Sequence, residues 1–309
     1  MSSIAPPPGA ATLSEATRLA LYRQMMEIRY CEKRAYDLFL QNLVKGTSHL
    51  ALGQEAVAAG FGVAMNKDDY TFLHSVSSTL IQNRVMFKQL GFDPDKDYTI
   101  VSGTSSGVLP AVVHSKTTPE EVKDLKSFID WAKGKKLNWG SWALGSSSHI
   151  FAQRLNEKYG LSIEVVTYKG ETPMWQDMGA GSLNAAMGSP QAMNSLLVKQ
   201  EVRAIVAPSR VRYVKLPDVK TSVEQGFDDP ALTVRGWLAL GAPKATPPEI
   251  VQKMSDLWVA AADSEPGKRI MDSFGLTEKP LNHQEVMKDY EYLKSVVIPL
   301  IVAFGIKPE

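Results

Sequence analysis

An α/β fold, in which short strands alternate with helices, is predicted from three features of this 309-residue sequence. Short apolar segments recur after Tyr70, helical periodicity fills most of the intervals between them, and two intervals open with a Thr-Pro-x-Glu pattern. That pattern is typical of a helix start, because the threonine hydroxyl and the glutamate carboxylate can both accept hydrogen bonds from free backbone N–H groups. With 44% hydrophobic residues, the chain is long enough for one large domain or two ordinary ones.

The first 69 residues are predicted to be helical rather than α/β. Residues 1–13 contain three consecutive prolines and a glycine, which indicates a flexible tail. From Ser14 to about Leu43, apolar residues recur every three or four positions, and this stripe predicts a long amphipathic helix with Cys31 on its buried face. A connector follows, and the small residues of 53–65 predict a second helix.

The remaining residues contain eight candidate strands. The predicted strands are Tyr70–His74, Asp97–Ser102, Leu109–His114, Leu137–Trp139, Ser162–Val166, Leu183–Met187, Val202–Val206 and Leu232–Leu240. Two helices are expected to begin with threonine caps at Thr118 and Thr246. A further helix is predicted from about Ser147 to Gly160, and another over Asn282–Phe304 with a kink or break at Pro299.

Composition excludes several classes of function. The 34 Lys and Arg against 33 Asp and Glu leave a net charge of +1, so there is no basic excess for nucleic acid. One cysteine excludes an internal disulfide, and five scattered histidines do not support a metal site. No apolar run is long enough for a membrane helix, so direct insertion into a membrane is not expected. Residues 1–20 lack the features of a signal peptide, which predicts a cytoplasmic location for the chain as written.

Three apparent motifs are weak on inspection. Gly103 to Gly107 fits the G-x-S-x-G nucleophile pattern around Ser105, but a strand rather than a helix is predicted after it. The segment that begins at Asp93 starts like a calcium loop and then lacks the glycine and the final glutamate. Gly179 and Gly181 do not follow a strand and lack the third glycine of a dinucleotide site. We therefore expect no catalytic residue, no cofactor and no metal.

Hydroxyl-rich connections follow three of the predicted strands. They are Ser75–Thr79, Gly140–His149 and Thr167–Pro173. Connections after the strands of an open α/β sheet converge where ligands bind, and helix N-termini with free N–H groups favour anions. Simple N-capping by serine and threonine explains any one of these loops, but three in one chain favour a site for a small carboxylate. The lack of paired acids or an activated nucleophile indicates binding without turnover.

Residues from about 71 to 309 resemble the extracytoplasmic receptors of tripartite tricarboxylate transporters, the Bug family. The resemblance rests on the order of several short motifs: GFDPDKD from Gly91, LNWGS from Leu137, GSSSH from Gly145, YKG from Tyr168, LPDV from Leu216, EQG from Glu224, TPPE from Thr246 and GIKPE from Gly305. It implies a type II periplasmic-binding-protein-like fold, with two α/β lobes around a cleft that closes on a small organic carboxylate. It also implies a periplasmic location for the family and membrane transporter subunits as partners.

Carried over by motif, the resemblance implies eight ligand-binding residues. They are Ser77, Ser78, Thr79, Ser146, Ser147, Ser148, Tyr168 and Gly170. The expected first lobe comprises residues 70–104 and 236–309, and the second lobe residues 105–235.

Residues from about 21 to 70 are similar to another family, the alpha subunit of thiamine-diphosphate-dependent 2-oxo acid dehydrogenases. The matching pieces are MEIR from Met26, GTSHL from Gly46, GQEAV from Gly53 and DDY from Asp68. The family's Gly-Asp-Gly cofactor motif is absent, so we expect no dehydrogenase activity. A fusion near residues 68–72 explains both resemblances, with the helical segment 14–69 replacing the first strands of the receptor's first lobe. The alternatives are a catalytically incomplete dehydrogenase fragment or a recombination product without a selected function.

Overall fold

The computed structural model describes most of the chain from residue 72 onward and parts of the segment before it. The described residues are 14–16, 18, 19, 22, 23, 25–27, 29, 30, 33, 72–88, 90, 92–105 and 107–306. The chain divides into two compact units, Met1–Thr71 and Phe72–Glu309.

In the first unit, the described residues between Glu15 and Lys33 are helical, as predicted for this part of the segment, whereas the rest of the predicted helix to about Leu43 lies outside the described residues. Met25 is half-buried, whereas Leu19, Tyr22 and Tyr30 are exposed. Cys31 and the predicted helix over 53–65 lie outside the described residues.

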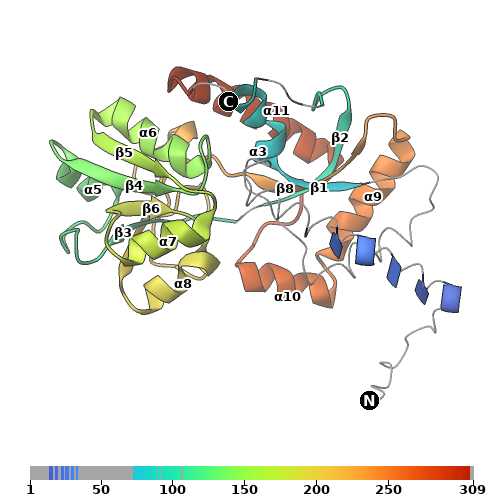
Figure 1. The fold of residues 1–309 in the computed structure, drawn as a ribbon, viewed down its shortest axis with the longest axis horizontal. Helices are drawn as coiled ribbons and strands as arrows, with labels where there is room; N and C mark the ends of the chain where they lie inside the picture. The colour runs from blue at the N-terminus through green and yellow to red at the C-terminus, as the bar shows by residue number, and fades with distance from the viewer. Residues whose placement is uncertain are drawn as a thin grey trace, which may run out of the picture. The chain divides into compact units, whose positions relative to one another are not determined.

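The second unit contains two sheets with helices on their faces (Figure 1). The strands are β1 (Leu73–Val76), β2 (Tyr98–Ser105), β3 (Ala111–His114), β4 (Lys136–Ser141), β5 (Ser162–Thr167), β6 (Ala185–Met187), β7 (Val202–Val206) and β8 (Trp237–Pro243). The helices are α3 (Ser77–Leu80), α4 (Asn83–Met86), α5 (Leu125–Ala132), α6 (Ser147–Tyr159), α7 (Glu171–Gly179), α8 (Pro190–Val198), the 3-10 helix η1 (Pro230–Leu232), α9 (Pro248–Ala261), α10 (Glu265–Phe274) and α11 (His283–Ala303). All eight predicted strands are confirmed, although their ends shift by up to five residues.

The five-stranded sheet has the order β5-β4-β6-β3-β7, and its side chains alternate between two apolar layers. Ala111 and Val113 of β3 pack with α5 and α6, whereas Val112 between them packs with α7 and α8. This alternation is the two-residue period of a strand, and it explains why both faces of the sheet carry helices. Figure 1 shows α6 on one side of this sheet and α7 and α8 on the other.

The three-stranded sheet has the order β1-β8-β2 with antiparallel pairing, and it is covered in the same way. Ile100 packs with α11, whereas its neighbour Val101 packs with α9. The Tyr98 ring crosses β8 at Gly241, where a side chain would overlap it, and its hydroxyl donates to the carbonyl of Leu73 at 3.2 Å. Glycine at 241 therefore lets one side chain tie β2 to β1 across the strand between them.

The chain passes between the two sheets twice, after β2 and before β8. The first crossing follows β2, which ends at Ser105, and the second precedes β8, which begins at Trp237, and the lobe boundaries after residues 104 and 235 stay a prediction. One side chain joins the crossings, because Arg235 donates to the Ser105 hydroxyl at 3.3 Å and forms an ion pair with Glu278.

Two helix ends agree with the sequence patterns. Helix α6 begins at Ser147 and ends before Gly160, whose φ of 64° is the left-handed conformation typical of a C-terminal cap. Helix α11 begins after Asn282, which forms a capping box with Glu285, and it continues through Pro299 to Ala303.

The two threonine caps were predicted wrongly. The segment after Thr118 forms turns, and α5 begins instead at Leu125, where Asp124 and Ser127 form a complete capping box. Helix α9 begins near the predicted position, but its N-cap residue is Pro247 and no side chain caps it. The hydroxyls of Thr118 and Thr246 are buried and have no hydrogen-bond partner in the described structure. Asp124 therefore outcompetes Thr118, since it offers two reciprocal hydrogen bonds to the helix start.

Candidate functional site

The connection after β4 is held in shape by its own hydroxyls. The Ser141 hydroxyl donates to the carbonyl of Ala143 at 2.9 Å and lies 2.8 Å from the Ser146 hydroxyl. Ser146 in turn caps α6 by accepting from the backbone N–H of His149 at 3.3 Å. Gly145, with a φ of +71°, turns the chain into the helix. This connection, residues 141–149, is called the β4 turn below.

Ser148 lies on the inward face of α6 and is fully buried. Its hydroxyl accepts from the Trp139 indole N–H at 2.9 Å and donates to the Gly140 carbonyl at 3.0 Å. A hydroxyl with both roles satisfied inside the protein has little left to offer a ligand. Ser148 therefore anchors the β4 turn to its strand.

Ser147 is one position away and has different surroundings. It is half-buried, and its hydroxyl has no hydrogen-bond partner among the described residues. As the first two residues of α6, Ser147 and Ser148 also carry backbone N–H groups for which the described part of the chain supplies no acceptor. Free N–H groups at the positive end of a 13-residue helix, beside a free hydroxyl, make a site that favours an anion.

His149 completes the β4 turn and was not among the predicted site residues. Its Nδ1 accepts a hydrogen bond from the Gly145 backbone N–H at 3.1 Å, and the residue is 5% exposed. Burial lowers the pKa of this imidazole below its ordinary value. The neutral ring therefore carries its proton on Nε2 and holds the turn through Nδ1. The signal available in the sequence was that a histidine stands three residues after Ser146, the residue that caps α6.

The connection after β5 is joined to the β4 turn by backbone hydrogen bonds. Tyr168 donates its N–H to the Ser141 carbonyl at 2.8 Å, and Gly170 donates to the Trp142 carbonyl at 3.0 Å. The Tyr168 hydroxyl donates to Asp177 at 2.7 Å. Burial, followed by this bond to Asp177, raises the pKa of Tyr168 to about 12. Tyr168 and Gly170 are therefore held against the β4 turn, and the phenol proton is retained at neutral pH.

The carboxylate of Glu171, which lies in the same connection, is held by neighbouring hydrogen-bond donors. Glu171 accepts from the Ser189 hydroxyl at 2.6 Å and from the Trp175 indole N–H at 3.1 Å. Ser189 follows β6, which runs parallel to β4, so Glu171 fixes a third strand end to the start of α7. These donors offset part of its negative charge.

The connection after β1 belongs to the other sheet. The Ser77 hydroxyl accepts from the Trp237 backbone N–H at 3.3 Å, whereas Ser78 and Thr79 are half-buried and their hydroxyls have no partner among the described residues. The next residue, Leu80, shares an apolar cluster with Ile150 of α6. Residues 77–79 are called the α3 turn below.

Two contacts place the α3 turn beside the β4 turn. The apolar cluster that contains Leu80 and Ile81 of the α3 side also contains Ile150, with Leu144 packed against it. The Met86 sulfur of α4 lies 3.0 Å from the position that a β-carbon of Gly145 would take. The β4 turn is therefore hydrogen-bonded to the connection after β5, and it is packed through Gly145 against Met86 of α4, the helix that follows the α3 turn.

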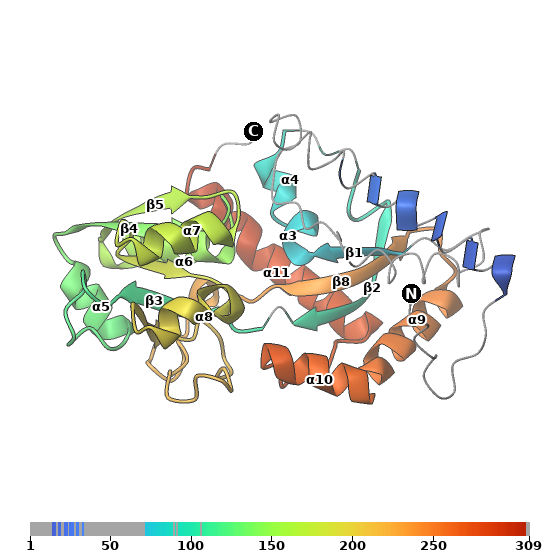
Figure 2. The same ribbon diagram turned by 60° about the horizontal axis from the view of Figure 1, so that its bottom comes forward.

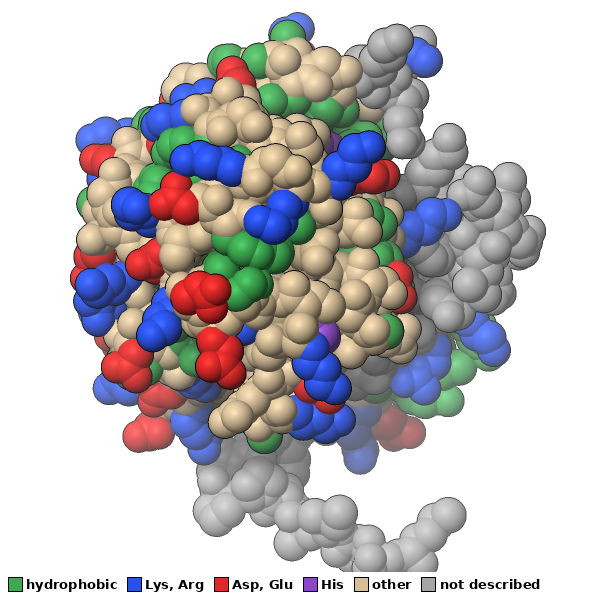
Figure 3. Space-filling view, turned by 90° about the vertical axis from the view of Figure 1, so that its left-hand side faces the viewer, with side chains coloured by type: hydrophobic (Ala, Val, Ile, Leu, Met, Phe, Trp, Pro, Cys, Tyr) green, Lys and Arg blue, Asp and Glu red, His purple; other side chains and the backbone are tan. Residues whose placement is uncertain are grey.

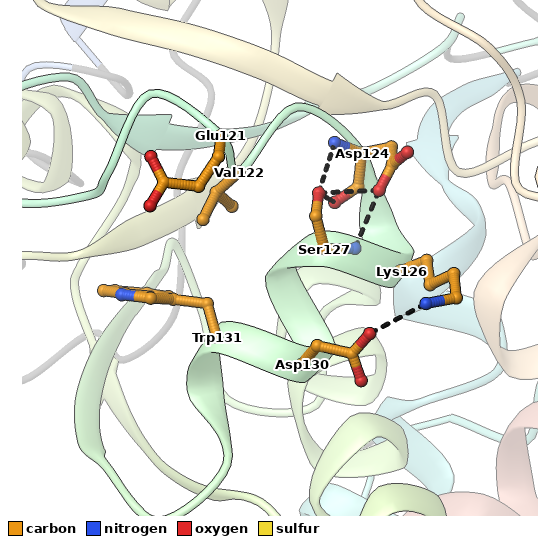
Figure 4. Close-up of a pocket in the computed structure, with 7 residues that line it drawn as sticks. All are labelled: Glu121, Val122, Asp124, Lys126, Ser127, Asp130 and Trp131. Atoms are coloured by element: carbon orange, nitrogen blue, oxygen red, sulfur yellow. Dashed lines mark hydrogen bonds and ion pairs between the residues drawn. The ribbon is translucent and has the colours of Figure 1, made fainter.

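A hollow of about 510 Å³ lies elsewhere, along α5 (Figure 4). Its charged residues are Glu121, Asp124, Lys126 and Asp130, with Lys126 paired to Asp130 at 2.9 Å. Both ribbon views place α5 far from α3 (Figures 1 and 2). Three acids against one lysine would repel a carboxylate, so this hollow does not match the predicted ligand.

The side of the molecule that carries the five-stranded sheet and its helices shows no concentration of one charge. Lys and Arg side chains are interspersed with Asp and Glu over it (Figure 3). Within the described ranges, no group of three His, Cys, Asp or Glu could hold a metal ion. No described helix is long and apolar enough to cross a membrane.

Comparison with known proteins gives one family match over most of the chain. The sequence profile described as "Tripartite tricarboxylate transporter family receptor" matches residues 52–295. A UPF0065 protein of Bordetella pertussis is 24% identical over 287 residues, which cover 88% of this chain and 86% of that protein. A UPF0065 protein of Pseudomonas sp. strain P51 is 26% identical over 192 residues, and the alignment spans only 55% of its length.

Solved structures share the fold. A protein of R. palustris with adipate has a TM-score of 0.67 at 24% identity, over 82% of this chain and 84% of that one. The periplasmic binding protein BugD has a TM-score of 0.63 at 18% identity, over 82% of this chain and 85% of that one. MatC of Rhodopseudomonas palustris with bound malate has a TM-score of 0.56 at 23% identity, over 76% of this chain and 77% of that one.

A short match of a different kind also exists. The human testis-specific pyruvate dehydrogenase E1 alpha subunit is 36% identical over 64 residues, which are 21% of this chain and 16% of that protein. The receptor profile begins at residue 52, before the predicted junction near residues 68–72.

Proposed function

The chain belongs to the tripartite tricarboxylate transporter family of receptors, and we propose that it binds a small organic dicarboxylate without converting it. The observation that carries this proposal is the start of α6. Among the described residues, the first two backbone N–H groups of this helix and the Ser147 hydroxyl have no partner, and the β4 turn that leads into the helix is hydrogen-bonded to the connection after β5.

The charges of the three connections fit this ligand. Lys169 is their only lysine or arginine, and Glu171 is held by Ser189 and Trp175. A carboxylate would therefore be bound mainly by N–H dipoles, hydroxyls and the N-terminal end of α6. Ser147, Ser78 and Thr79 are the side chains that we assign to ligand contact. Gly170 and Tyr168 shape the wall beside them, and Ser77, Ser146 and Ser148 support the turns.

Two structurally similar proteins were solved with adipate and with malate, and both ligands carry two carboxylates. A ligand of this kind can place one carboxylate at the start of α6 and the other toward the α3 turn. This arrangement would join the two sheets through the ligand, as expected for a receptor that closes on its solute. Membrane transporter subunits are then the proposed partners of the loaded form.

Titration of the intrinsic tryptophan fluorescence with adipate and malate tests the proposal, because Trp142 lies within the β4 turn and is half-buried. We expect a saturable change with at least one of them. Adipamide, which keeps the chain length but lacks the charge, should produce none. Failure of a folded protein to respond to these and to other small di- and tricarboxylates would contradict the proposal.

The segment before residue 71 is proposed to derive from a dehydrogenase alpha subunit. The short match to the pyruvate dehydrogenase subunit supports this origin, and the boundary between the compact units, at Thr71, coincides with the predicted junction. We expect no thiamine diphosphate site, so thiamine diphosphate with Mg²⁺ should leave the melting temperature unchanged. A rise in melting temperature that requires both additions would favour the dehydrogenase alternative.

A further inference from the structure

We propose that neutral His149 is a positioning residue that holds the β4 turn in its ligand-binding form, so that acidification weakens carboxylate binding. This inference rests on the function proposed above and concerns the regulation of the same site. It starts from one contact, the hydrogen bond that the Gly145 N–H donates to His149 Nδ1 at 3.1 Å.

This contact requires an unprotonated Nδ1. When the ring gains a proton, Nδ1 becomes a donor and faces the Gly145 N–H, which is also a donor. The pair then loses its hydrogen bond and two donors meet in a buried place, since His149 is 5% exposed. Gly145 then loses the contact that sets its position. Its φ of +71° does not fix the position by itself, because a glycine adopts many other backbone conformations at similar energy.

The Gly145 position matters because both sides of the site depend on it. On one side, the turn leads directly into Ser146, whose hydroxyl caps α6 and places Ser147. On the other side, Met86 of α4 packs against Gly145 and thereby connects the β4 turn to the part of the chain that carries Ser78 and Thr79. A displaced Gly145 would therefore disturb the free N–H groups and the contact between the two sheets together.

Burial alone lowers the pKa of His149, and no neighbouring charge contributes. Most of the charged side chains on the elements around α6 have partners of their own: Arg84 with Asp95, Arg154 and Lys158 with Asp229, Lys294 with Asp95 and Glu291, Asp289 with Trp237, and Glu171 with Ser189. Two others, Lys136 and Glu164, stand early in β4 and β5, away from the β4 turn. Lys169 also has a partner. Asp289 titrates as well, since burial raises its pKa, and the test must separate the two groups.

Three substitutions separate the role of Nδ1 from general packing. His149→Asn keeps an acceptor near the Nδ1 position and cannot gain a proton. Its affinity for the carboxylate should therefore be close to that of the wild type at pH 8, and it should lack the fall at lower pH that protonation of His149 causes in the wild type. His149→Gln places its polar group near Nε2 instead, and His149→Leu has no acceptor. Both should bind about tenfold more weakly at every pH, as expected for one lost hydrogen bond to a buried N–H.

The measurement is the dissociation constant for adipate from pH 8 down to one pH unit below the midpoint at which the His149 ring nitrogens are seen to titrate in a ¹⁵N-labelled protein. Below the pKa of His149, the wild type should weaken relative to His149→Asn by at least the roughly tenfold loss expected for His149→Leu, because protonation removes the same hydrogen bond. The ratio of the two proteins removes the titration of adipate itself and of Asp289, which they share. Equal pH profiles for the wild type and His149→Asn would overturn the proposal.

A ligand-free readout distinguishes this inference from the proposed function. In a ¹⁵N-labelled protein, the Gly145 amide should shift with pH in step with the His149 ring nitrogens, and His149→Asn should abolish that shift. If adipate and the other carboxylates do not bind but the two signals titrate together, the proposed function fails while His149 still controls the turn. A Gly145 amide that ignores the titration of His149 would refute the inference whatever the ligand results.

Discussion

The β4 turn and the α3 turn both carry three consecutive hydroxyl residues, but the structure uses them differently. In the β4 turn, the Ser146 and Ser148 hydroxyls are hydrogen-bonded inside the protein, whereas the Ser147 hydroxyl has no partner among the described residues. In the α3 turn, the Ser77 hydroxyl is hydrogen-bonded, and the described part of the chain offers no partner to Ser78 or Thr79. One turn is therefore built around internal hydrogen bonds, and the other keeps most of its hydroxyls available.

The elements behind the turns explain this difference. The β4 turn opens a 13-residue helix that packs on a five-stranded sheet, so its caps and anchors secure a large structure. The α3 turn opens a helix of four residues on a three-stranded sheet. We infer that the β4 turn supplies a preorganised half of the carboxylate site and the α3 turn an adjustable half.

The largest expected effect tests the internal role of Ser148. Ser148→Ala leaves the buried Trp139 N–H without its acceptor, and the free energy of unfolding should fall by about 2–3 kcal/mol. Ser147→Ala, on the same helix and one residue away, should change it by less than about 0.5 kcal/mol. Urea denaturation measures both variants, and equal losses would contradict the assignment of their roles.

The same comparison can be made for binding. Ser147→Ala should weaken adipate binding about tenfold, because it removes a hydroxyl from a preorganised anion site. Ser78→Ala should weaken it only about threefold, since the α3 turn can adjust and Thr79 remains. Fluorescence titration gives both values. A larger loss for Ser78→Ala would reverse the inferred order of the two turns.

A smaller effect concerns stability in the α3 turn. Ser77→Ala removes the acceptor for the Trp237 N–H, and we expect a loss of about 1 kcal/mol in the free energy of unfolding. Thr79→Val is the matched control that deletes a free hydroxyl with almost no change of shape, and it should be close to neutral. If the two variants were equally destabilised, the hydrogen bond from Trp237 would have no special role.

The smallest expected effect is a pH dependence of the free energy of unfolding that comes from Asp95, whose partner Arg84 also donates to the Leu80 carbonyl next to the α3 turn. The hydrogen bond from Arg84 is the main cause that lowers the pKa of Asp95 to about 2. A lowered acid pKa means that the folded state favours the charged carboxylate, so the stabilisation is complete above about pH 4 and is lost as the pH falls toward 2. Because the Asp95 side chain is 44% exposed, solvent screening should keep it below about 1 kcal/mol.

The variant Asp95→Asn measures this contribution. Its difference from the wild type in unfolding free energy should be constant from pH 7 to about pH 4.5 and should shrink at lower pH. A difference that stays constant down to pH 2.5 would exclude the titration of Asp95 as its source.

Local patterns predicted the elements of this protein well. The eight strands, the start and end of α6, and the bounds of α11 follow from apolar periodicity and glycine, which act within a few residues of the chain. The serine-rich connections predicted where a site would form, and that location stays a prediction. Local patterns failed at Thr118, where a better cap six residues later determined the helix start.

The sequence by itself therefore determined the α/β fold, the receptor family and the three hydroxyl-rich connections that we propose as the site, because these depend on short-range periodicity and on ordered motifs. Only the tertiary structure decided which hydroxyls are free and that His149 holds Gly145. Ser147 and Ser148 are chemically identical, and they differ only because α6 packs Ser148 against Trp139, whereas Ser147 has no partner in the part of the chain that the structure describes. Burial and contact between distant segments separate such residues, and neither can be read from the residue types alone.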